Sequence, residues 1–185
     1  MKIITAPHPT LRQQAKPVKK LDKKILQFSQ DLITTLAKSK EPKGVGLAAN
    51  QVDKLWQVIA LNIPRKFPEP IALFNPQISK HSKKQTLGKN PKKPKLEGCL
   101  SLPKIYGPVP RWQWIELNYQ VIANSQLKKQ AQRFDDFAAR VIQHELDHLN
   151  GILFTDHCLQ NNLPVYQEIA EELVEITDRS LLEMF

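Results

Sequence analysis

Apolar residues recur at intervals of three and four in two parts of the chain, and this spacing predicts two amphipathic helices. The first is expected from Asp22, which can cap a helix N-terminus, to about residue 37. Its apolar positions are Ile25, Phe28, Leu32 and Leu36. The second is expected from a cap at residue 135 or 136 to Gly151, a residue type that often ends a helix. One stripe of this helix carries Phe137, Val141, His144 and His148.

Strands are predicted between these helices. Residues 57–62 and 71–78 have the composition of short strands, and residues 113–122 and 126–133 are expected to form a hairpin that turns at Asn124-Ser125. A last helix is predicted from 162–164 onward, because Ile169, Leu173 and Ile176 are spaced by four and three. Strands in the middle of the chain with helices on both sides favour an α+β fold.

Length and composition limit the class of protein. A chain of 185 residues favours a single domain over 1–185, and 41% hydrophobic with 24% charged residues argues against disorder. No apolar stretch approaches the roughly 18 residues of a membrane helix, and the N-terminus lacks the apolar core of a signal peptide. We therefore expect no membrane association and a cytoplasmic location. Two cysteines exclude a disulfide scaffold.

Charge is unevenly distributed along the chain. The formal net charge is +9, and residues 80–95 contain seven lysines and no acid. Gly88, Pro91 and Pro94 in the same stretch are typical of an exposed loop. Residues 163–185 instead contain six acids and one arginine. An anionic partner is compatible with this balance and not required by it.

The strongest chemical signal is the sequence QHELDH over residues 143–148. His144 and His148 lie four positions apart, so both rings can reach one metal ion from the same helix face. Glu145 is close enough to handle the proton of an attacking water. The alternative is two solvated histidines on an ordinary helix. Asp147 either orients a ligand histidine or pairs with a cation.

Cys99, in the sequence EGCLS over residues 97–101, is the best candidate for a third ligand. A thiolate binds a borderline or soft metal, and Gly98 allows a close backbone approach. Two histidines and one cysteine leave a fourth position open, as in a catalytic metal site. The alternative is a buried structural thiol. We expect exposed loop histidines at His8, His81 and His157 and a buried thiol at Cys158.

A third segment, GVGLAANQ over residues 44–51, combines small residues with an amide. Its two glycines and two alanines let the backbone approach a ligand, and Gln51 can donate a hydrogen bond. Taken alone, this segment is equally consistent with a structural turn before a helix.

The three motifs GVGLAANQ, EGCLS and QHELDH, in this order, resemble the signature motifs of the peptide deformylase family. The opening PHPTLRQQAKPV and the NGILFTD after the third motif are also similar to the family, so the resemblance covers nearly the whole chain. It implies small antiparallel sheets packed around a central metal-binding helix, with a C-terminal helix. The chain departs from the family pattern in its lysine-rich 80–95 and in its acidic C-terminus.

The resemblance also implies an activity, namely removal of the N-formyl group from the formylmethionine of newly made polypeptides, with release of formate. Cys99, His144 and His148 would hold one divalent ion, natively Fe(II), which Zn, Ni or Co can replace. Glu145 would transfer the proton, and Gln51 with the backbone N–H of Leu100 would stabilise the oxyanion.

Further residues are assigned to substrate and support. The backbone of Gly46 would line the peptide, and the methionine side chain would contact Val45, Phe137 and Val141. Buried Glu97 would need a partner, for which Arg111 is the candidate, with Gln143 as a hydrogen-bonding neighbour. The substrates are formylmethionyl nascent peptides. The enzyme is expected to be a monomer that contacts the ribosome through the lysines of 80–95.

Three rival interpretations remain at this point. A metalloprotease with a His-Glu-x-x-His helix would share the histidines but would not explain Cys99 or Gln51. The second is an inactive binding protein on the same scaffold. The third is an RNA-binding module, which the lysines permit and the metal motif makes unnecessary.

Overall fold

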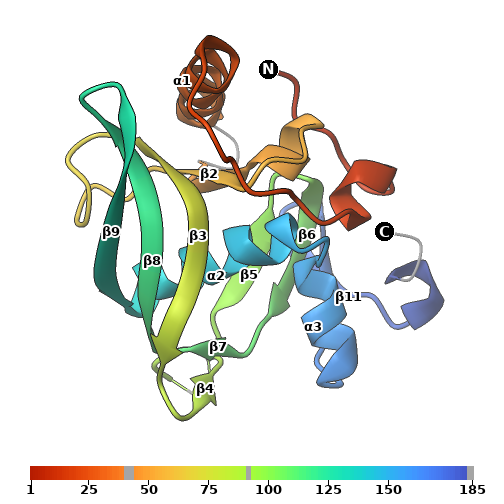
Figure 1. The fold of residues 1–185 in the computed structure, drawn as a ribbon. Helices are drawn as coiled ribbons and strands as arrows, with labels where there is room; N and C mark the ends of the chain where they lie inside the picture. Colours follow the sequence, from red (N-terminus) through yellow and green to blue (C-terminus); the bar gives the residue numbers. More distant parts are fainter. Residues whose placement is uncertain (40–43, 91–92, 183–185) are drawn as a thin grey trace.

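Antiparallel sheets enclose one helix in the computed structural model, which describes residues 1–39, 44–90 and 93–182 (Figure 1). A five-stranded sheet has the order β1 (Gly46–Ala48), β2 (Val58–Leu61), β3 (Ile71–His81), β8 (Trp114–Ala123) and β9 (Gln126–Asp135). A four-stranded sheet has the order β11 (Glu172–Glu175), β10 (Tyr166–Ile169), β6 (Leu102–Pro108) and β5 (Leu96–Cys99). The helix between them is α2 (Asp136–Leu149). The expected α+β class is therefore confirmed.

The remaining elements are short, apart from α1 (Lys23–Lys38). The strands β4 (Gln85–Thr86) and β7 (Arg111–Trp112) pair with each other. The helix α3 (Phe154–Gln160) follows α2, and three 3-10 turns complete the described chain: η1 (Pro9–Arg12), η2 (Ala49–Val52) and η3 (Arg179–Leu182).

The predicted start of α1 and the predicted hairpin are confirmed. The side chain of Asp22 accepts a hydrogen bond from the backbone N–H of Ile25 at 2.8 Å, as an N-cap should. The strands β8 and β9 pair without interruption around Asn124 and Ser125, which both have positive φ. Two such residues match the twist of antiparallel strands, so this turn closes the hairpin tightly.

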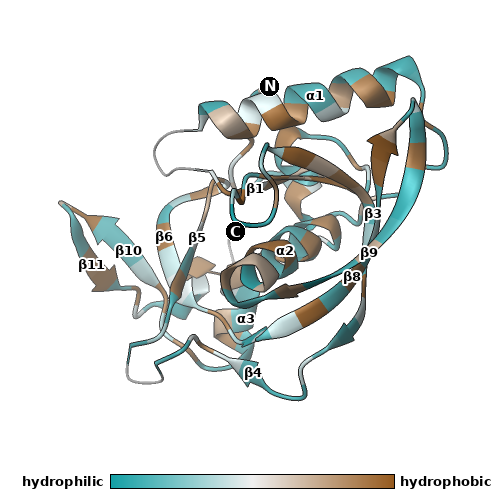
Figure 2. Ribbon diagram, turned by 90° about the vertical axis from the view of Figure 1, so that its left-hand side faces the viewer, coloured by the Kyte–Doolittle hydropathy of each residue, from teal (hydrophilic) through white to brown (hydrophobic). Residues whose placement is uncertain are grey.

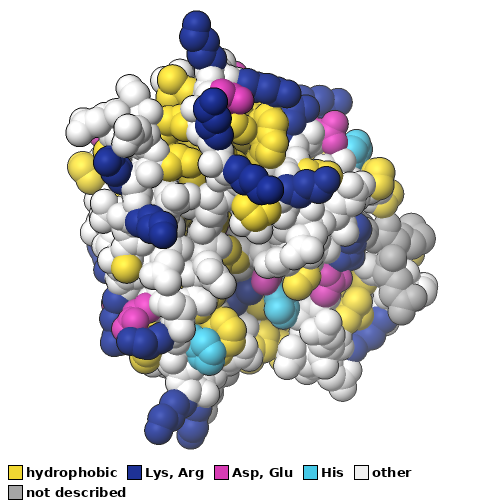
Figure 3. Space-filling model, viewed as in Figure 1, with side chains coloured by type: hydrophobic (Ala, Val, Ile, Leu, Met, Phe, Trp, Pro, Cys, Tyr) yellow, Lys and Arg dark blue, Asp and Glu magenta, His cyan; other side chains and the backbone are white. Residues whose placement is uncertain are grey.

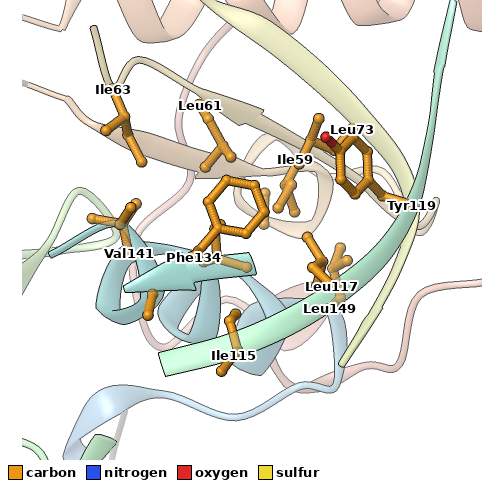
Figure 4. Close-up of a cluster of buried hydrophobic side chains, with 14 of the residues drawn as sticks. Ile59, Leu61, Ile63, Leu73, Ile115, Leu117, Tyr119, Phe134, Val141 and Leu149 are labelled. Carbon is orange, nitrogen blue, oxygen red and sulfur yellow. The ribbon is translucent and has the colours of Figure 1, made fainter. Parts of the chain in front are cut away.

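The strands β1 and β2 are buried on both faces of the five-stranded sheet, with α1 packed on one face and α2 on the other (Figure 2). Side chains alternate along β2: Val58 and Ala60 pack with α1, and Ile59 and Leu61 pack toward α2. Figure 4 shows the cluster on the α2 side, where Phe134 lies among Leu61, Ile59 and Val141. Each fully buried side chain of this kind stabilises the fold by roughly 1.5–3 kcal/mol, so α2 is held firmly against the sheet.

The prediction of a helix from 162–164 onward is wrong. Residues 166–175 form the hairpin β10–β11, and η3 is the helical turn nearest the C-terminus among the described residues. The chain reverses at Ala170 and Glu171, which both have positive φ. Tyr166 pairs with Tyr106 of β6, so a sheet edge supplied by distant sequence overrides the local helical spacing. Ile169 consequently remains 52% exposed instead of facing a core.

The lysine-rich segment 80–95 is only partly an irregular loop. β3 extends into it as far as His81, and β4 lies within it. Two of its residues, 91 and 92, lie outside the described residues. Lys and Arg side chains are widespread on the face drawn in Figure 3, as the net charge of +9 suggests. Within the described ranges, no helix has the length and apolar character needed to span a membrane.

Candidate metal centre and active site

A pocket of about 200 Å³ opens between α2 and two sheet edges. β1 and β5 are the edge strands of their sheets, and they flank α2 on either side of this pocket (Figure 2). All three segments singled out in the sequence contribute to its lining: residues 44–46 and 51, residues 97–100, and residues 144 and 145 of α2. The fold thus brings the three motifs to one place.

Cys99 and His144 line this pocket, and together with His148 they form a cluster. One donor atom from each lies within 4.8 Å of the others, and all three residues are buried. The sulfur of Cys99 lies 3.2 Å from Nε2 of His148. Residues one helical turn apart on α2 therefore face the end of β5, as the i, i+4 spacing predicted. One sulfur and two imidazole nitrogens are a donor set that suits a borderline divalent metal.

Glu97 sets the orientation of His144. Its Oε2 lies 3.0 Å from Nδ1 of His144, which leaves Nε2 of the ring for an ion. Arg111 donates to both carboxylate oxygens of Glu97, at 3.0 and 2.9 Å. Burial alone raises the pKa of Glu97, but Arg111 and His144 together outweigh this effect and hold the pKa well below its usual range. The predicted Glu97–Arg111 pair is confirmed.

The electrostatics favour a thiolate at Cys99. Burial raises the pKa of the thiol, but the imidazoles of His148 and His144 lower it well below its ordinary value. Two polar groups also point at the sulfur: the backbone N–H of Ser101 at 3.4 Å and Nε2 of Gln51 at 3.5 Å. The thiolate is the form that binds metals, so the cluster is prepared for a cation.

Glu145 lies against the backbone of Gly46 at the wall of the pocket. A Cβ added to Gly46 would be 2.2 Å from Oε1 of Glu145, so a larger residue at this position would displace the carboxylate. Oε2 of Glu145 is buried and has no hydrogen-bond partner among the described residues. Burial raises the pKa of this carboxyl to about 7, against the opposing effect of His144 and His148. A carboxyl group in this state can both accept and release a proton near neutral pH.

Gln51 and Leu100 lie on the side of the pocket toward the cysteine. The amide of Gln51 is fixed at both ends: Oε1 accepts from the N–H of Ala48 at 2.8 Å, and Nε2 donates to Oγ of Ser101 at 3.1 Å. Leu100 follows Cys99 directly and lines the same pocket. Ser101 was not singled out in the sequence, although its place in the EGCLS motif was the available signal.

The residues expected to contact the first side chain also line the pocket. Val45, Phe137 and Val141 are all present, and Phe137 is 42% exposed at its mouth. Two cationic residues that the sequence interpretation omitted, Lys95 and Arg140, line it as well. Nη1 of Arg140 donates to Oε1 of Glu97 at 2.8 Å, so this carboxylate is shared by two guanidinium groups.

Comparison with known proteins decides the family. The family model described as polypeptide deformylase matches residues 1–163. The chain belongs to the peptide deformylase family. Peptide deformylase 2 of Nostoc sp. is 39% identical over 180 residues, which cover 93% of this chain and 93% of that relative. The peptide deformylase of Acinetobacter baumannii is 32% identical over 177 residues, covering 96% of this chain and 93% of the relative.

Solved structures of the peptide deformylase family have the same fold. The enzyme of Synechococcus elongatus in complex with actinonin has a TM-score of 0.72 and 32% identity, with 85% of this chain and 78% of that one covered. The enzyme of Thermotoga maritima has a TM-score of 0.71 and 32% identity, with 84% and 95% covered. This chain is accordingly a metallo-hydrolase that removes the N-formyl group from newly made polypeptides.

Behind the deformylase pocket, the structure decides between the two alternatives for Asp147 in favour of pairing with a cation, and it places His157 and Gln143 differently from expectation. Asp147, whose role the sequence left open, pairs with Nη1 of Arg111 at 2.5 Å. His157 is not in an exposed loop but lies half-buried on α3, 2.8 Å from the same carboxylate. Gln143 forms hydrogen bonds with the backbone of Trp112 and not with Glu97. Its Oε1 accepts from the N–H of Trp112 and its Nε2 donates to the carbonyl of Trp112, both at 2.9 Å. A hydrogen-bonded chain therefore runs from α3 to the metal cluster.

Proposed function

We propose that Cys99, His144 and His148 hold one divalent ion, natively Fe(II), at which this chain hydrolyses the formamide of a formylmethionyl peptide. The single observation that carries the proposal is the convergence of these three donors beside the unpartnered carboxylate of Glu145. When bound, the ion supplies a Lewis acid that polarises the formyl carbonyl and makes water a nucleophile at neutral pH. The choice of Fe(II) rests on the family resemblance, and Zn, Ni or Co also suits this donor set.

Glu145 acts as the proton carrier. Its carboxylate takes a proton from the attacking water as the new C–O bond forms at the formyl carbon. The same carboxyl then delivers that proton to the departing amine nitrogen as the C–N bond breaks. The products are formate and a peptide with a free N-terminal methionine. The pKa of Glu145, near 7, suits both transfers.

Gln51 and Leu100 stabilise the oxyanion that forms on the former carbonyl oxygen. The amide of Gln51 is oriented before substrate arrives by its bonds to Ala48 and Ser101, and the N–H that now points at the sulfur of Cys99 is the one that turns to the oxyanion. The backbone N–H of Leu100 is the second donor. Losing one donor of this kind typically lowers kcat by about 10²–10³-fold.

The peptide lies in the pocket between the edges of β1 and β5. Gly46 faces its backbone, since a free strand edge offers unpaired N–H and C=O groups to an extended chain. Val45, Phe137 and Val141 surround the methionine side chain, since these apolar residues line the pocket beside Gly46 and Glu145. A charged side chain in this place would lose its hydration without a partner.

A comparison of two blocked peptides tests the proposed function. Formyl-Met-Ala-Ser should release formate, whereas acetyl-Met-Ala-Ser should remain intact, and neither should be cut at an internal peptide bond. Internal cleavage would instead support the metalloprotease interpretation. Metal analysis of protein purified without oxygen, alongside activity, tests the assignment of Fe(II).

Contact with the ribosome is proposed through lysines of the segment 80–95. Lys83 and Lys84 are exposed beside β4, and neither forms an ion pair with any residue in the described ranges. If about three or four lysines meet phosphate, log K should fall with log salt at a slope of roughly −2 to −4. Replacing both lysines with Ala should flatten the slope, and replacing the exposed Lys128 and Lys129 of β9 should not.

The proposal includes a setting and a state of assembly. The enzyme acts as a monomer in the cytoplasm, where formylated chains are made, and residues 1–185 work as one catalytic domain. The single domain is supported by the placement of every assigned residue around one pocket.

A further inference from the structure

A second and larger hollow of about 710 Å³ adjoins the active-site pocket. Three residues, Lys95, Phe137 and Arg140, line both cavities. The outer cavity, called the basic hollow below, is lined by Arg65 after β2, by residues 86, 88–90, 93 and 95, by residues 111–113 and by the first turns of α2. A peptide leaving the pocket past Phe137 would therefore enter it.

The lining of the basic hollow is strongly positive. Arg65, Lys89, Lys93 and Lys95 contribute cations, while Asp136 is the one acid among its described lining residues. Asp136 already pairs with Lys89, at 2.9 Å. Within the described ranges, the other three cations form no ion pair, so the hollow has positive charge in excess.

The side chain of Lys95 is held at the junction of the two cavities. Its ammonium lies 4.2 Å from the centre of the Phe137 ring, a cation–π contact that fixes the stem across the mouth of the pocket. Partial burial and the neighbouring guanidinium of Arg140 lower the pKa of Lys95, and the carboxylates of Glu97 and Asp136 offset this only in part. A carboxylate close to Lys95 would relieve this repulsion.

We infer that the basic hollow binds carboxylate side chains of the residues that follow methionine in the substrate, so that acidic nascent N-termini are preferred. The inference rests on the proposed function, and it adds a substrate class to it. A peptide is favoured over an RNA because the hollow shares residues with the pocket that receives the first side chain. The affinity of an RNA phosphate for the basic hollow would not depend on these shared residues.

Two matched peptides test the preference. Formyl-Met-Ala-Glu-Glu should have a kcat/KM about three- to tenfold higher than formyl-Met-Ala-Gln-Gln at low salt, since each partly exposed ion pair contributes modestly. The gain should lie in KM, because the contact is the same in ground and transition states. It should disappear at about 0.5 M salt. Equal kcat/KM values at low salt would overturn the inference.

Variants locate the effect in the basic hollow. Lys95→Met keeps an apolar stem over Phe137 without the charge, and Arg65→Gln removes a cation from the opposite wall. Each should bring the ratio of the two kcat/KM values toward one. Lys128→Gln, at an exposed position on β9, is the matched control and should leave the ratio unchanged. An unchanged ratio in Lys95→Met and Arg65→Gln would refute this location.

Binding of product peptides separates this inference from the proposed function. Calorimetry should show tighter binding of Met-Ala-Glu-Glu than of Met-Ala-Gln-Gln, whether or not any peptide is deformylated. If no formate is released but the acidic peptide still binds more tightly, the proposed function is refuted and the inference about the basic hollow stands. Weaker binding of a short RNA by the variants, with the peptide ratio unchanged, would overturn the inference in favour of nucleic acid.

Discussion

Gly46→Ala tests the placement of the proton carrier without altering any ionisable group. The added Cβ would lie 2.2 Å from Oε1, 2.7 Å from Cδ and 2.8 Å from Cγ of Glu145. Ordinary contact begins at 3.4 Å, so the carboxylate must move by about 1.2 Å. Because Glu145 is only 3% exposed, it has little free space in which to move.

The size of the effect follows from this displacement. A shift of about 1 Å in a catalytic group can lower the rate by roughly 10²-fold. We expect kcat on formyl-Met-Ala-Ser to fall by about that factor, with metal content retained, because the three atoms nearest to the new methyl group all belong to Glu145 and none to Cys99, His144 or His148. The strain should also lower the free energy of unfolding by about 1–3 kcal/mol.

Steady-state kinetics, metal analysis and urea unfolding of one preparation measure these quantities. Gly107→Ala is the control, since its Cβ would meet Sγ of Cys158 at 2.7 Å and lies outside the pocket. It should be destabilised to a similar extent and keep most of its kcat. A Gly46→Ala enzyme with near wild-type kcat would refute the placement of Glu145.

Three further outcomes are expected. Cys99→Ser should lose metal, because a hydroxyl replaces a thiolate poorly, whereas Cys158→Ser should keep it; equal metal loss would contradict the ligand assignment. Val141→Asp should raise KM for formyl-Met peptides or abolish turnover, and an unchanged KM would argue against an apolar pocket. Glu97→Gln should lower the free energy of unfolding by about 3–5 kcal/mol, because buried Arg140 loses its carboxylate partner and buried Arg111 keeps only Asp147. Asp156→Asn, in a more exposed pair, should cost about 0–1 kcal/mol in the same urea titration, and comparable losses would disprove the difference.

Local patterns predicted the parts of this fold whose stabilisation is itself local. The helix α2 follows from its apolar stripe, and the β8–β9 hairpin from a turn at Asn124-Ser125. The spacing of Ile169, Leu173 and Ile176 failed for the opposite reason. What decides the structure of that segment is pairing with β6, sixty residues earlier in the chain, and no local pattern encodes this contact.

The site divides in the same way. Two residues four positions apart lie on the same face of any α-helix, so the sequence alone was sufficient to place His144 and His148 together on α2. The pairing of Arg140 with Glu97 was not predicted, because in the sequence Arg140 is an ordinary polar position on an amphipathic helix. The side chain of Arg140 reaches Glu97 only because the fold packs α2 beside β5, and the sequence does not encode this packing locally. The pairing of His157 with Asp147 was not predicted either, because it depends on how α3 packs against α2.

Glu145→Gln provides the most direct test of the account as a whole. The amide keeps the size of the side chain but cannot accept the proton of the attacking water. Formate release from formyl-Met-Ala-Ser should fall by about 10²–10⁴-fold, while metal content and the urea midpoint stay close to those of the wild-type protein. A folded, metal-loaded variant with near wild-type turnover would contradict the account.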